Sequence, residues 1–356
     1  MCDQYREDVA RGGIQNARFC SFVIKRMPGK NQIEDVPAML EKYPLMNGYW
    51  DDKSAKLEKI HVPAYVVASW TSPIHSHGTI DGFRRISSKE KWLRVHNTQE
   101  WPDYYATENV EDPRRFFDRY LKGIDNGWEQ TPRARLSVLD PGGVDQVNRS
   151  ENEFPLARTK YENLYLDGAA GTLSTGPVAR ESATRYQADD GKGQAIFTLR
   201  FDEETELTGY MKLRLWVEAS GADDMDLFVF VQKLDEQGNV LSPKIWTIPA
   251  QTPTGRLRVS HREIDEARST FFEPVHTHCR EQPLSPGQIV PVDIPLWPVS
   301  LLWHKGQQLR LLVAGYDLAP PLLPMISPAL TRNRGEHIIH TGGKYDSHLI
   351  VPKIPR

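Results

Sequence analysis

The sequence predicts a multidomain α+β protein with three parts: a helical segment over residues 1–55, a small α/β unit over 56–133 and a β-sandwich over 134–356. Three observations predict this order. A helical periodicity occurs near residue 40, an alternation of strands and helices follows it, and short alternating β segments occupy the rest. A chain of 356 residues is long enough for two ordinary domains, each with its own core.

Composition limits the partners and the compartment. The net charge is -3 at pH 7 with acids and bases interspersed, so no basic patch predicts nucleic-acid binding. No apolar run approaches the roughly 20 residues of a membrane helix, and the charged N-terminus lacks the apolar region of a signal peptide. The cysteines, Cys2, Cys20 and Cys279, show no CxxC spacing, which argues against structural zinc and a disulfide framework. We therefore expect a cytoplasmic protein that binds neither nucleic acid nor membranes.

The first segment contains an amphipathic helix. Apolar residues recur there at spacings of three and four: Val36, Met39, Leu40 and Tyr43. Asp35 is a suitable N-cap, and Pro37 falls in the first turn, where proline is tolerated.

The α/β unit begins with a strand. Residues 62–68 form a near-continuous apolar run rich in β-branched residues, which suits a strand buried on both faces of a parallel sheet. A short helix over 79–88 and a second strand over 91–98 follow. The next helix is capped by Asp112 with Pro113 in its first position. Its apolar residues are expected to share one face: Phe116, Phe117, Tyr120, Leu121 and Ile124.

After about residue 134 the pattern changes to short β segments separated by Gly, Pro, Asp and Asn, with no helix between them. The stretch LDEQGNVL has the composition of a hairpin turn. Many short strands without helices indicate a β-sandwich of the jelly-roll type.

Four stretches of the β region carry a resemblance to a known family: DDMDLFVFVQKLDEQGNV, GRLRVSHRE, IPLWPVSLLWHKGQQLRLLVAGYD and TGGKYDSHLIVP. They resemble the C-terminal jelly-roll domain of serine hydrolases of the cocaine-esterase and X-Pro dipeptidyl-peptidase types, in family order over about 134–353. The α/β unit resembles the end of that family's catalytic domain, and the first 50 residues resemble its helical cap. The amino-acid sequence is most similar to that of fungal members. The resemblance implies a truncated α/β-hydrolase remnant with N-terminal cap-like helices, followed by a β-sandwich jelly roll.

The same resemblance implies that the Ser-His-Asp triad is missing. These hydrolases carry their nucleophile in a G-x-S-x-G elbow, and no such motif occurs in this sequence. The family's acid ends a Gly-Trp-Tyr-Asp-like motif, where this sequence has Ser72 after Ser69-Trp70-Thr71. The family's His follows the next strand, and Glu100 falls near its position. Since losing triad members costs several orders of magnitude in rate, we expect no triad hydrolysis.

The candidate site lies where the two predicted parallel strands end, because open α/β sheets bind ligands at the carboxyl ends of their strands. The candidate catalytic residues are His75, His96 and Glu100, since a histidine beside a carboxylate can transfer protons near neutral pH. The candidate substrate-binding residues are polar or aromatic neighbours: Trp70, Ser72, His77, Trp101, Asp103, Tyr104 and Tyr105. We expect a pocket between the 70–78 loop, the 96–105 loop and the N-terminal helices, with the jelly roll as one wall. The alternative is structural: histidines that satisfy loop backbone, and WPDYY packed against the jelly roll.

No metal or cofactor is expected. His75 and His77, and likewise His276 and His278 beside Cys279, have a spacing that could hold a metal, but a bare H-x-H pair is weak evidence. Arg262, in the jelly-roll signature, is expected to bridge strands or domains. Ser72 as a substitute nucleophile lacks an elbow and an evident base.

Three functions are compatible with these features, and fold analogy alone does not choose among them. The one we favour is a non-hydrolytic enzyme recruited from a serine-hydrolase scaffold. It would act as an isomerase or cyclase, promoting a rearrangement, cyclisation or elimination on a hydrophobic small-molecule intermediate of fungal secondary metabolism. The alternatives are an ester or amide hydrolase with an atypical or chain-completed active site, and a non-catalytic ligand- or partner-binding protein.

The strand at 61–68 also predicts assembly. Its open edge is too apolar to face water, and such edges recruit further strands. We expect a homodimer through this edge or the N-terminal helices, because a two-fold arrangement is the commonest solution.

Overall fold

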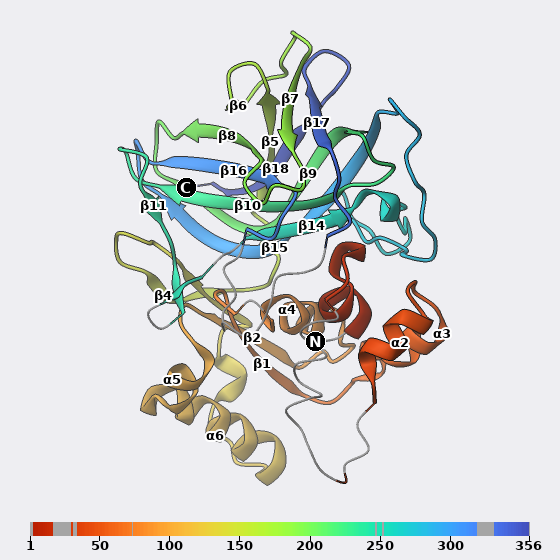
Figure 1. Ribbon diagram of the computed structural model, residues 1–356. Coiled ribbons are helices and arrows are strands. Elements are labelled where there is room, and N and C mark those ends of the chain that lie inside the picture. The colour runs from red at the N-terminus through yellow and green to blue at the C-terminus, as the bar shows by residue number, and fades with distance from the viewer. Residues whose placement is uncertain are drawn as a thin grey trace.

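The computed structural model describes residues 3–16, 30, 34–72, 74–245, 248–250, 253–318 and 331–355. A β-sandwich lies above a smaller α/β layer, with helices α2 and α3 at one side (Figure 1). The mixed α+β, multidomain class predicted from the sequence is confirmed. Cys2 and Cys20 lie outside the described residues, and Cys279 is exposed with a free thiol.

The N-terminal part consists of short helices that pack on one another and, through η2 (Arg11–Gly13), on strand β14 (Thr254–Arg258) of the sandwich. They are the π-helical turn η1 (Tyr5–Val9), η2, α2 (Val36–Lys42), α3 (Gly48–Asp52) and η3 (Leu57–Lys59). Asp35 caps α2 as predicted, because its carboxylate accepts a hydrogen bond from the Ala38 amide at 3.1 Å. Leu40 and Trp50 are buried together with Tyr5, so η1, α2 and α3 share one small core.

The α/β layer is a four-stranded sheet in the order β1-β2-β3-β4. Its strands are β1 (Ala64–Ser69), β2 (Lys91–His96), β3 (Ala134–Val138) and β4 (Gln146–Glu151). The first three run parallel, and β4 is antiparallel to β3. Its helices are α4 (Ser76–Arg85), α5 (Glu100–Tyr105), α6 (Thr107–Lys122) and the short η4 (Trp128–Gln130). Helix α4 lies between this sheet and the sandwich, whereas α5 and α6 lie on the far side (Figure 1).

Two details of the α/β prediction are corrected. Strand β1 is not buried on both faces: Val67 is 39% exposed, and Val62, just before the strand, is 66% exposed. It is also an edge strand, which pairs only with β2 among the described residues. Helix α6 starts at Thr107 and carries Pro113 in its interior. Within it, Phe116 packs against Trp92 and Trp128. The predicted common face is therefore split, and several of its members are exposed: Phe117, Leu121 and Ile124.

The boundary between the two sheets also differs from the prediction. Strands β3 and β4 were expected in the sandwich, but β3 pairs in parallel with β2, from Leu93 opposite Ala134 onward. The alternation in this segment is that of any half-buried strand, so it did not distinguish the two sheets. The sandwich begins at β5, and Leu139 joins the layers through backbone hydrogen bonds with Ser300 and Leu302.

The sandwich is a jelly-roll-like sheet that closes on itself. Its strands are β5 (Lys160–Asp167), β6 (Thr172–Ser174), β7 (Ser182–Gln187), β8 (Gln194–Arg200), β9 (Thr205–Ser220), β10 (Asp226–Leu234), β11 (Val240–Leu241), β14 (Thr254–Arg258), β15 (Val290–Trp303), β16 (Gln308–Ala314), β17 (Glu336–Thr341) and β18 (His348–Ile354). The hydrogen-bonded order is β15-β14-β10-β16-β8-β6-β5-β18-β9, and β9 pairs back onto β15. A separate hairpin joins β12 (Lys244–Ile245) and β13 (Ile248–Pro249), and η5 (Val259–His261) follows β14.

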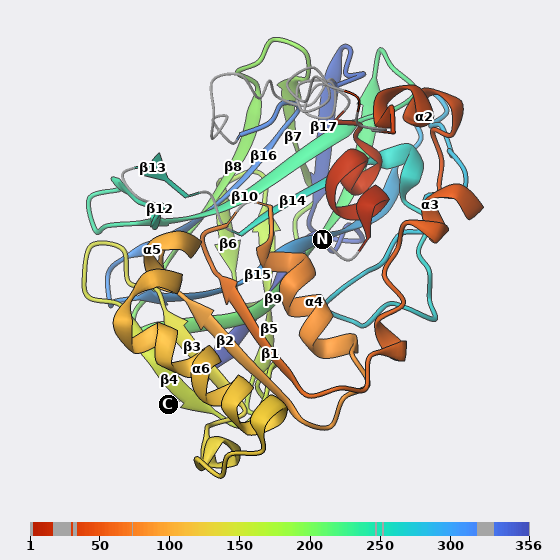
Figure 2. The same ribbon diagram turned by 90° about the horizontal axis from the view of Figure 1, so that it is seen from below.

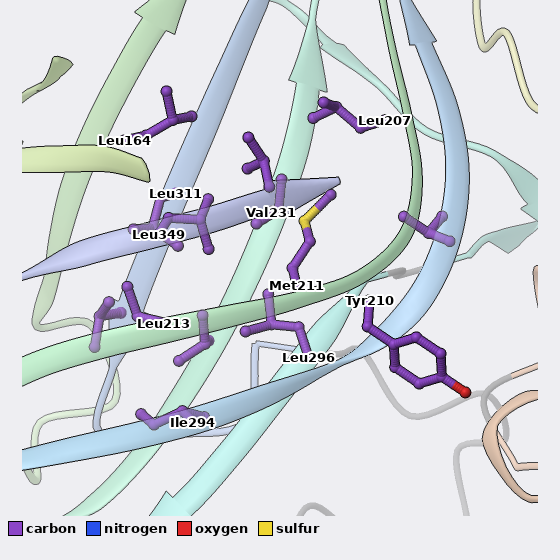
Figure 3. Packing of buried hydrophobic residues seen from close by; sticks show 14 of the residues in the cluster. Leu164, Leu207, Tyr210, Met211, Leu213, Val231, Ile294, Leu296, Leu311 and Leu349 are labelled. Atoms are coloured by element: carbon purple, nitrogen blue, oxygen red, sulfur yellow. The ribbon is translucent and has the colours of Figure 1, made fainter. Parts of the chain in front are cut away.

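One continuous apolar core fills the sandwich. Figure 3 shows Met211 and Leu213 of β9 among Leu296 of β15 and Leu349 of β18. Tyr210 points away from these side chains, and the Arg84 guanidinium of α4 lies 4.7 Å from its ring. The same strand therefore lines the core on one side and faces the α/β layer on the other.

The predicted hairpin turn after β10 is confirmed. The Asp235 carboxylate accepts hydrogen bonds from the amides of Gln237 and Asn239, and Gly238 has a φ of 89°. Within the described ranges, no helix is long and apolar enough to cross a membrane.

Candidate functional site

The carboxyl ends of β1 and β2, where the sequence placed the site, are held by internal hydrogen bonds. Trp70 is 1% exposed, and its indole N–H donates to the Ser137 carbonyl at 2.6 Å. The Ser72 hydroxyl accepts from the His75 amide at 3.1 Å, and the Ser76 hydroxyl donates to the Ser72 carbonyl at 2.7 Å. Trp70 and Ser72 therefore fix the turn from β1 into α4, while His75 remains exposed at that turn.

At the end of β2, Asp103 is bound by Arg94 rather than left for a ligand. Both nitrogens of the Arg94 fork donate to the Asp103 carboxylate, and the Asn109 side chain donates to it as well. His96 is 2% exposed, with Nδ1 3.7 Å from the nearer oxygen of that carboxylate. Burial lowers the pKa of His96 despite this carboxylate. His96 is therefore neutral at pH 7.

The predicted 96–105 loop contains helix α5, which Gln99 caps: its side chain accepts a hydrogen bond from the Trp101 amide at 2.7 Å. The three aromatic side chains of α5 are exposed: Trp101 by 65%, Tyr104 by 59% and Tyr105 by 75%. Glu100 is half-buried at the start of the helix. Among the described residues, these aromatic side chains belong neither to the jelly-roll core nor to the lining of the cavity described below. They face away, because α5 lies on the far side of the sheet (Figure 1).

A cavity of about 390 Å³ lies elsewhere, between the N-terminal turns, α4 and the sandwich. In Figure 2, η1 is seen beside α4 and the ends of β14 and β15. The lining residues include Asp3, Arg6, Glu7, Arg11, His77, Asp81, Arg84, Arg85, Tyr210, Arg256, Arg268, Glu273, His276, His278 and Trp297. The cavity has three of the four walls expected from the sequence: the N-terminal segment, the jelly roll and, through His77, the 70–78 segment. Of the ten predicted site residues, only His77 is among the described residues that line it.

His77 is held between two carboxylates. Its Nδ1 lies 3.5 Å from the nearer Glu7 oxygen and its Nε2 lies 3.8 Å from the nearer Glu273 oxygen, and its ring stacks on Trp297 with centroids 5.5 Å apart. Burial alone would lower the pKa of His77, but the two carboxylates outweigh it and raise the pKa from 6.5 to about 9. His77 is therefore a cation at neutral pH, able to donate a proton or a hydrogen bond.

Glu273 connects His77 to a second cation. The Arg84 guanidinium donates to Glu273 at 2.6 Å and lies over the Tyr210 ring. Burial would raise the pKa of Glu273, but the charge of His77 and the charge and hydrogen bond of Arg84 lower it. Glu273 is therefore ionised and orders both cations in the wall of the cavity.

A second group of histidines borders the cavity and is uncharged. Burial lowers the pKa of both His261 and His276 to about 4, and it lowers that of His278 well below the usual value. The Nδ1 atoms of His261 and His278 are 3.0 Å apart, so one ring donates to the other. Among the residues that the structure describes, no group of three or more His, Cys, Asp or Glu side chains is arranged to hold a metal ion. Of the two H-x-H pairs, His77, His276 and His278 line the cavity, whereas His75 is exposed.

Sequence reasoning missed most of this cavity. Glu7, Arg11, Glu273 and Trp297 stand in no recognisable motif, and they come together only through tertiary packing of distant segments. The signal that existed was the repeated H-x-H spacing, since His77, His276 and His278 all line the cavity.

A comparison with known protein families shows to which family the chain belongs. Residues 126–350 match the model described as the X-Pro dipeptidyl-peptidase C-terminal non-catalytic domain. The chain belongs to this family. The match covers β5 to β18 except for the last residues of β18, and it reaches back over β3 and β4.

Curated relatives of this X-Pro dipeptidyl-peptidase C-terminal family member match a larger share of the chain than the family model does. The cocaine esterase of Rhodococcus sp. is 25% identical over 303 residues, which cover 71% of this chain and 47% of that protein. The chain spans about half the length of the curated relatives it matches.

Solved structures place the whole chain within one architecture. A CocE/NonD family hydrolase from Staphylococcus aureus is 36% identical, with a TM-score of 0.94 over 99% of this chain and 66% of that one. An aminopeptidase from a marine sediment archaeon, Thaumarchaeota archaeon, is 14% identical with a TM-score of 0.72, over 100% of this chain and 71% of that one, and so shows the fold alone.

Proposed function

We propose that the chain forms part of a hydrolase of esters or amides whose nucleophile is supplied by a segment that docks on strand β1. This is the atypical, chain-completed hydrolase considered among the alternatives from sequence. The observation that carries the proposal is the likeness to the S. aureus hydrolase, which continues through the α/β layer, whereas this chain covers 66% of that structure. The absence of a Ser-His-Asp triad within this chain is part of the proposal.

The free edge of β1 supports such docking. Strand β1 pairs on one side only among the described residues, and Val67 is 39% exposed. An unpaired edge strand with apolar side chains is a template for another strand. A docked segment would lie next to the turn that carries Ser72 and the exposed His75.

Within this proposal His75 is the general base. It stands at the carboxyl end of β1, it is exposed, and no described group buries it. His96 and Glu100 remain the other predicted acid–base residues, but His96 is neutral and enclosed beside the Arg94–Asp103 pair.

The test compares hydrolysis of p-nitrophenyl esters and aminoacyl anilides by the chain alone and by a chimera. The chimera adds to this chain the part of the S. aureus hydrolase that the chain does not cover. We expect turnover by the chimera to exceed that of the chain alone by about 100-fold or more, with a fluorophosphonate probe labelling a serine of the added segment. His75→Ala should lower turnover by roughly 10²- to 10⁴-fold, the range for general acid–base catalysis.

His61→Ala is the matched control, because His61 is equally exposed but precedes the amino end of β1. Equal loss in both variants would contradict the role of His75. Labelling of Ser72, or equal hydrolysis by the chain alone, would contradict the docking of a catalytic segment.

The second candidate is the non-hydrolytic rearrangement, cyclisation or elimination. The observation that favours it is the cavity with His77, a protonated side chain that can act as a general acid. The charges in the cavity argue against a wholly hydrophobic intermediate. The fungal and secondary-metabolism parts of this hypothesis rest on the sequence resemblance. Substrate turnover by the chain alone that His77→Gln abolishes would favour this candidate over hydrolysis.

We also propose that, without a docked segment, a second copy of the chain covers β1. Light scattering coupled to size exclusion should then give twice the monomer mass of 40.7 kDa. Val67→Lys should shift the chain to monomer, because a lysine on an edge strand opposes strand addition. Val147→Lys, on β4 at the other edge of the same sheet, is the control and should leave the dimer intact. A monomeric parent chain would exclude this dimer.

A further inference from the structure

The cavity carries more positive than negative charge. Its carboxylates are each matched by a cation: Asp3 by Arg6 at 2.7 Å, Asp81 by Arg85 at 3.0 Å, Glu273 by Arg84 at 2.6 Å and Glu7 by His77 at 3.5 Å. Three further lining arginines remain after this matching: Arg11, Arg256 and Arg268. The cavity therefore has a surplus of cations that its own carboxylates do not balance.

Arg11 is the clearest case. Its guanidinium donates to the Thr254 carbonyl at 2.6 Å and to the Thr254 hydroxyl at 3.3 Å, which uses two of its five N–H groups. In the described part of the chain, no carboxylate lies within ion-pair distance of it. Arg256 lies close enough to repel it and has its nearest carboxylate, Asp317, at 3.6 Å.

Gly12 explains why these two arginines are neighbours. It adopts a φ of 62°, and a Cβ atom there would lie 2.1 Å from the Arg256 carbonyl oxygen. Only glycine lets the N-terminal turn approach β14 so closely. The backbone is therefore built to bring Arg11 against Arg256, although like charges repel.

The proximity of Arg11 to Arg256 favours the binding of an anion. Burial lowers the pKa of Arg11 well below its usual value and the charge of Arg256 lowers it further, while the charges of Asp317 and Glu7 raise it. Because these carboxylates are not within ion-pair distance of Arg11, a ligand carboxylate on its guanidinium fork would add charge-assisted hydrogen bonds.

The remaining wall is apolar. The Arg11 guanidinium lies 3.9 Å from the Trp297 ring centroid, and Pro295 and Leu296 line the cavity beside this ring. A volume of about 390 Å³ is within the range of small-molecule sites. We propose that this cavity binds a small carboxylic acid, with its carboxylate on Arg11 and Arg256 and its apolar body along Trp297. The proposal holds independently of the proposed hydrolysis and of any docked segment.

Calorimetry on the full chain tests the proposal with phenylacetate, its neutral counterpart phenylacetamide, and inorganic phosphate. We expect saturable binding of phenylacetate, with binding of the amide and of phosphate at least tenfold weaker. Arg11→Gln and Arg256→Gln should each weaken phenylacetate binding at least tenfold. Arg185→Gln, an exposed arginine of β7, is the control and should leave binding unchanged.

A measurement on the unaltered chain tests the same site without depending on whether the variants fold. Phenylglyoxal modifies accessible arginines, and peptide mass spectrometry should show that phenylacetate, but not phenylacetamide, protects Arg11. Equal affinity for acid and amide, or no protection of Arg11, would overturn the carboxylate site. Phosphate binding as tightly as phenylacetate would overturn the role of Trp297. No outcome depends on turnover, so failure here is distinct from failure of the hydrolase proposal.

Discussion

Arg258→Met is expected to lower the free energy of unfolding by about 3–5 kcal/mol, because it leaves a buried carboxylate without its counter-ion. Arg258 is 2% exposed, and its Nε and Nη2 atoms donate to the two oxygens of Asp226 at 2.7 and 2.9 Å. The two residues are direct partners in the pairing of β14 with β10. Methionine keeps much of the apolar stem but offers no donor, so Asp226 loses its strongest partner.

Urea unfolding at pH 7 measures this effect. Arg214→Met is the matched control, since the half-buried Arg214 makes longer ion pairs of 3.4 and 3.3 Å, and such pairs contribute about 1 kcal/mol or less. Adding Asp226→Asn to Arg258→Met should recover part of the loss, because the uncompensated charge is removed. A loss below about 1 kcal/mol in Arg258→Met would contradict the expected cost of a buried unpaired charge.

The same strand shows where the sequence was informative and where it was not. The stretch GRLRVSHRE was recognised as structural, and a bridging arginine was expected at Arg262. The observed bridge is made by Arg258, while Arg262 donates to the carbonyls of Val259 and Gln282. The arginines stand on either side of a helical turn, so the strand period does not reveal which one meets a carboxylate on β10.

Secondary structure was predictable where the signal was local. The cap of α2 by Asp35 and the turn at Asp235 depend on neighbouring residues only, and both were found as expected. Sheet membership is not local. The strand over Ala134–Val138 has the same alternation as a sandwich strand, but its partner is β2, which only the tertiary fold determines.

In the candidate site, too, only the residue with a local sequence signal was predicted. His77 was found because it belongs to an H-x-H pair beside a predicted strand end. Its partners Glu7 and Glu273 come from segments that are far from His77 in the sequence, and nothing in either segment marks them. Trp101, Tyr104 and Tyr105 were assigned to the pocket because aromatic residues after a strand often line one, but α5 directs them to solvent.

The stability of the chain is expected to fall between about pH 6.5 and pH 9 through His77. Its pKa is 6.5 when unfolded and about 9 when folded, so the folded state holds the proton more tightly. The stabilisation is therefore complete below pH 6.5 and is lost as the pH rises through 9. A difference of this size corresponds to about 3 kcal/mol. Unfolding free energies of the parent chain and of His77→Gln should thus converge as the pH rises across this window.

His75→Gln is the matched control, because His75 lies two residues away at the start of the same helix but is exposed. Its curve should run parallel to that of the parent chain. The low pKa values of His261 and His276, about 4 in both cases, act in the opposite direction, since folding then loses stability as the pH falls from 6.5 to 4. This loss of stability at acid pH is expected equally in the parent chain, in His77→Gln and in His75→Gln, so it does not affect their comparison. Parallel curves for His77→Gln and the parent chain above pH 6.5 would show that Glu7 and Glu273 do not hold a proton on His77.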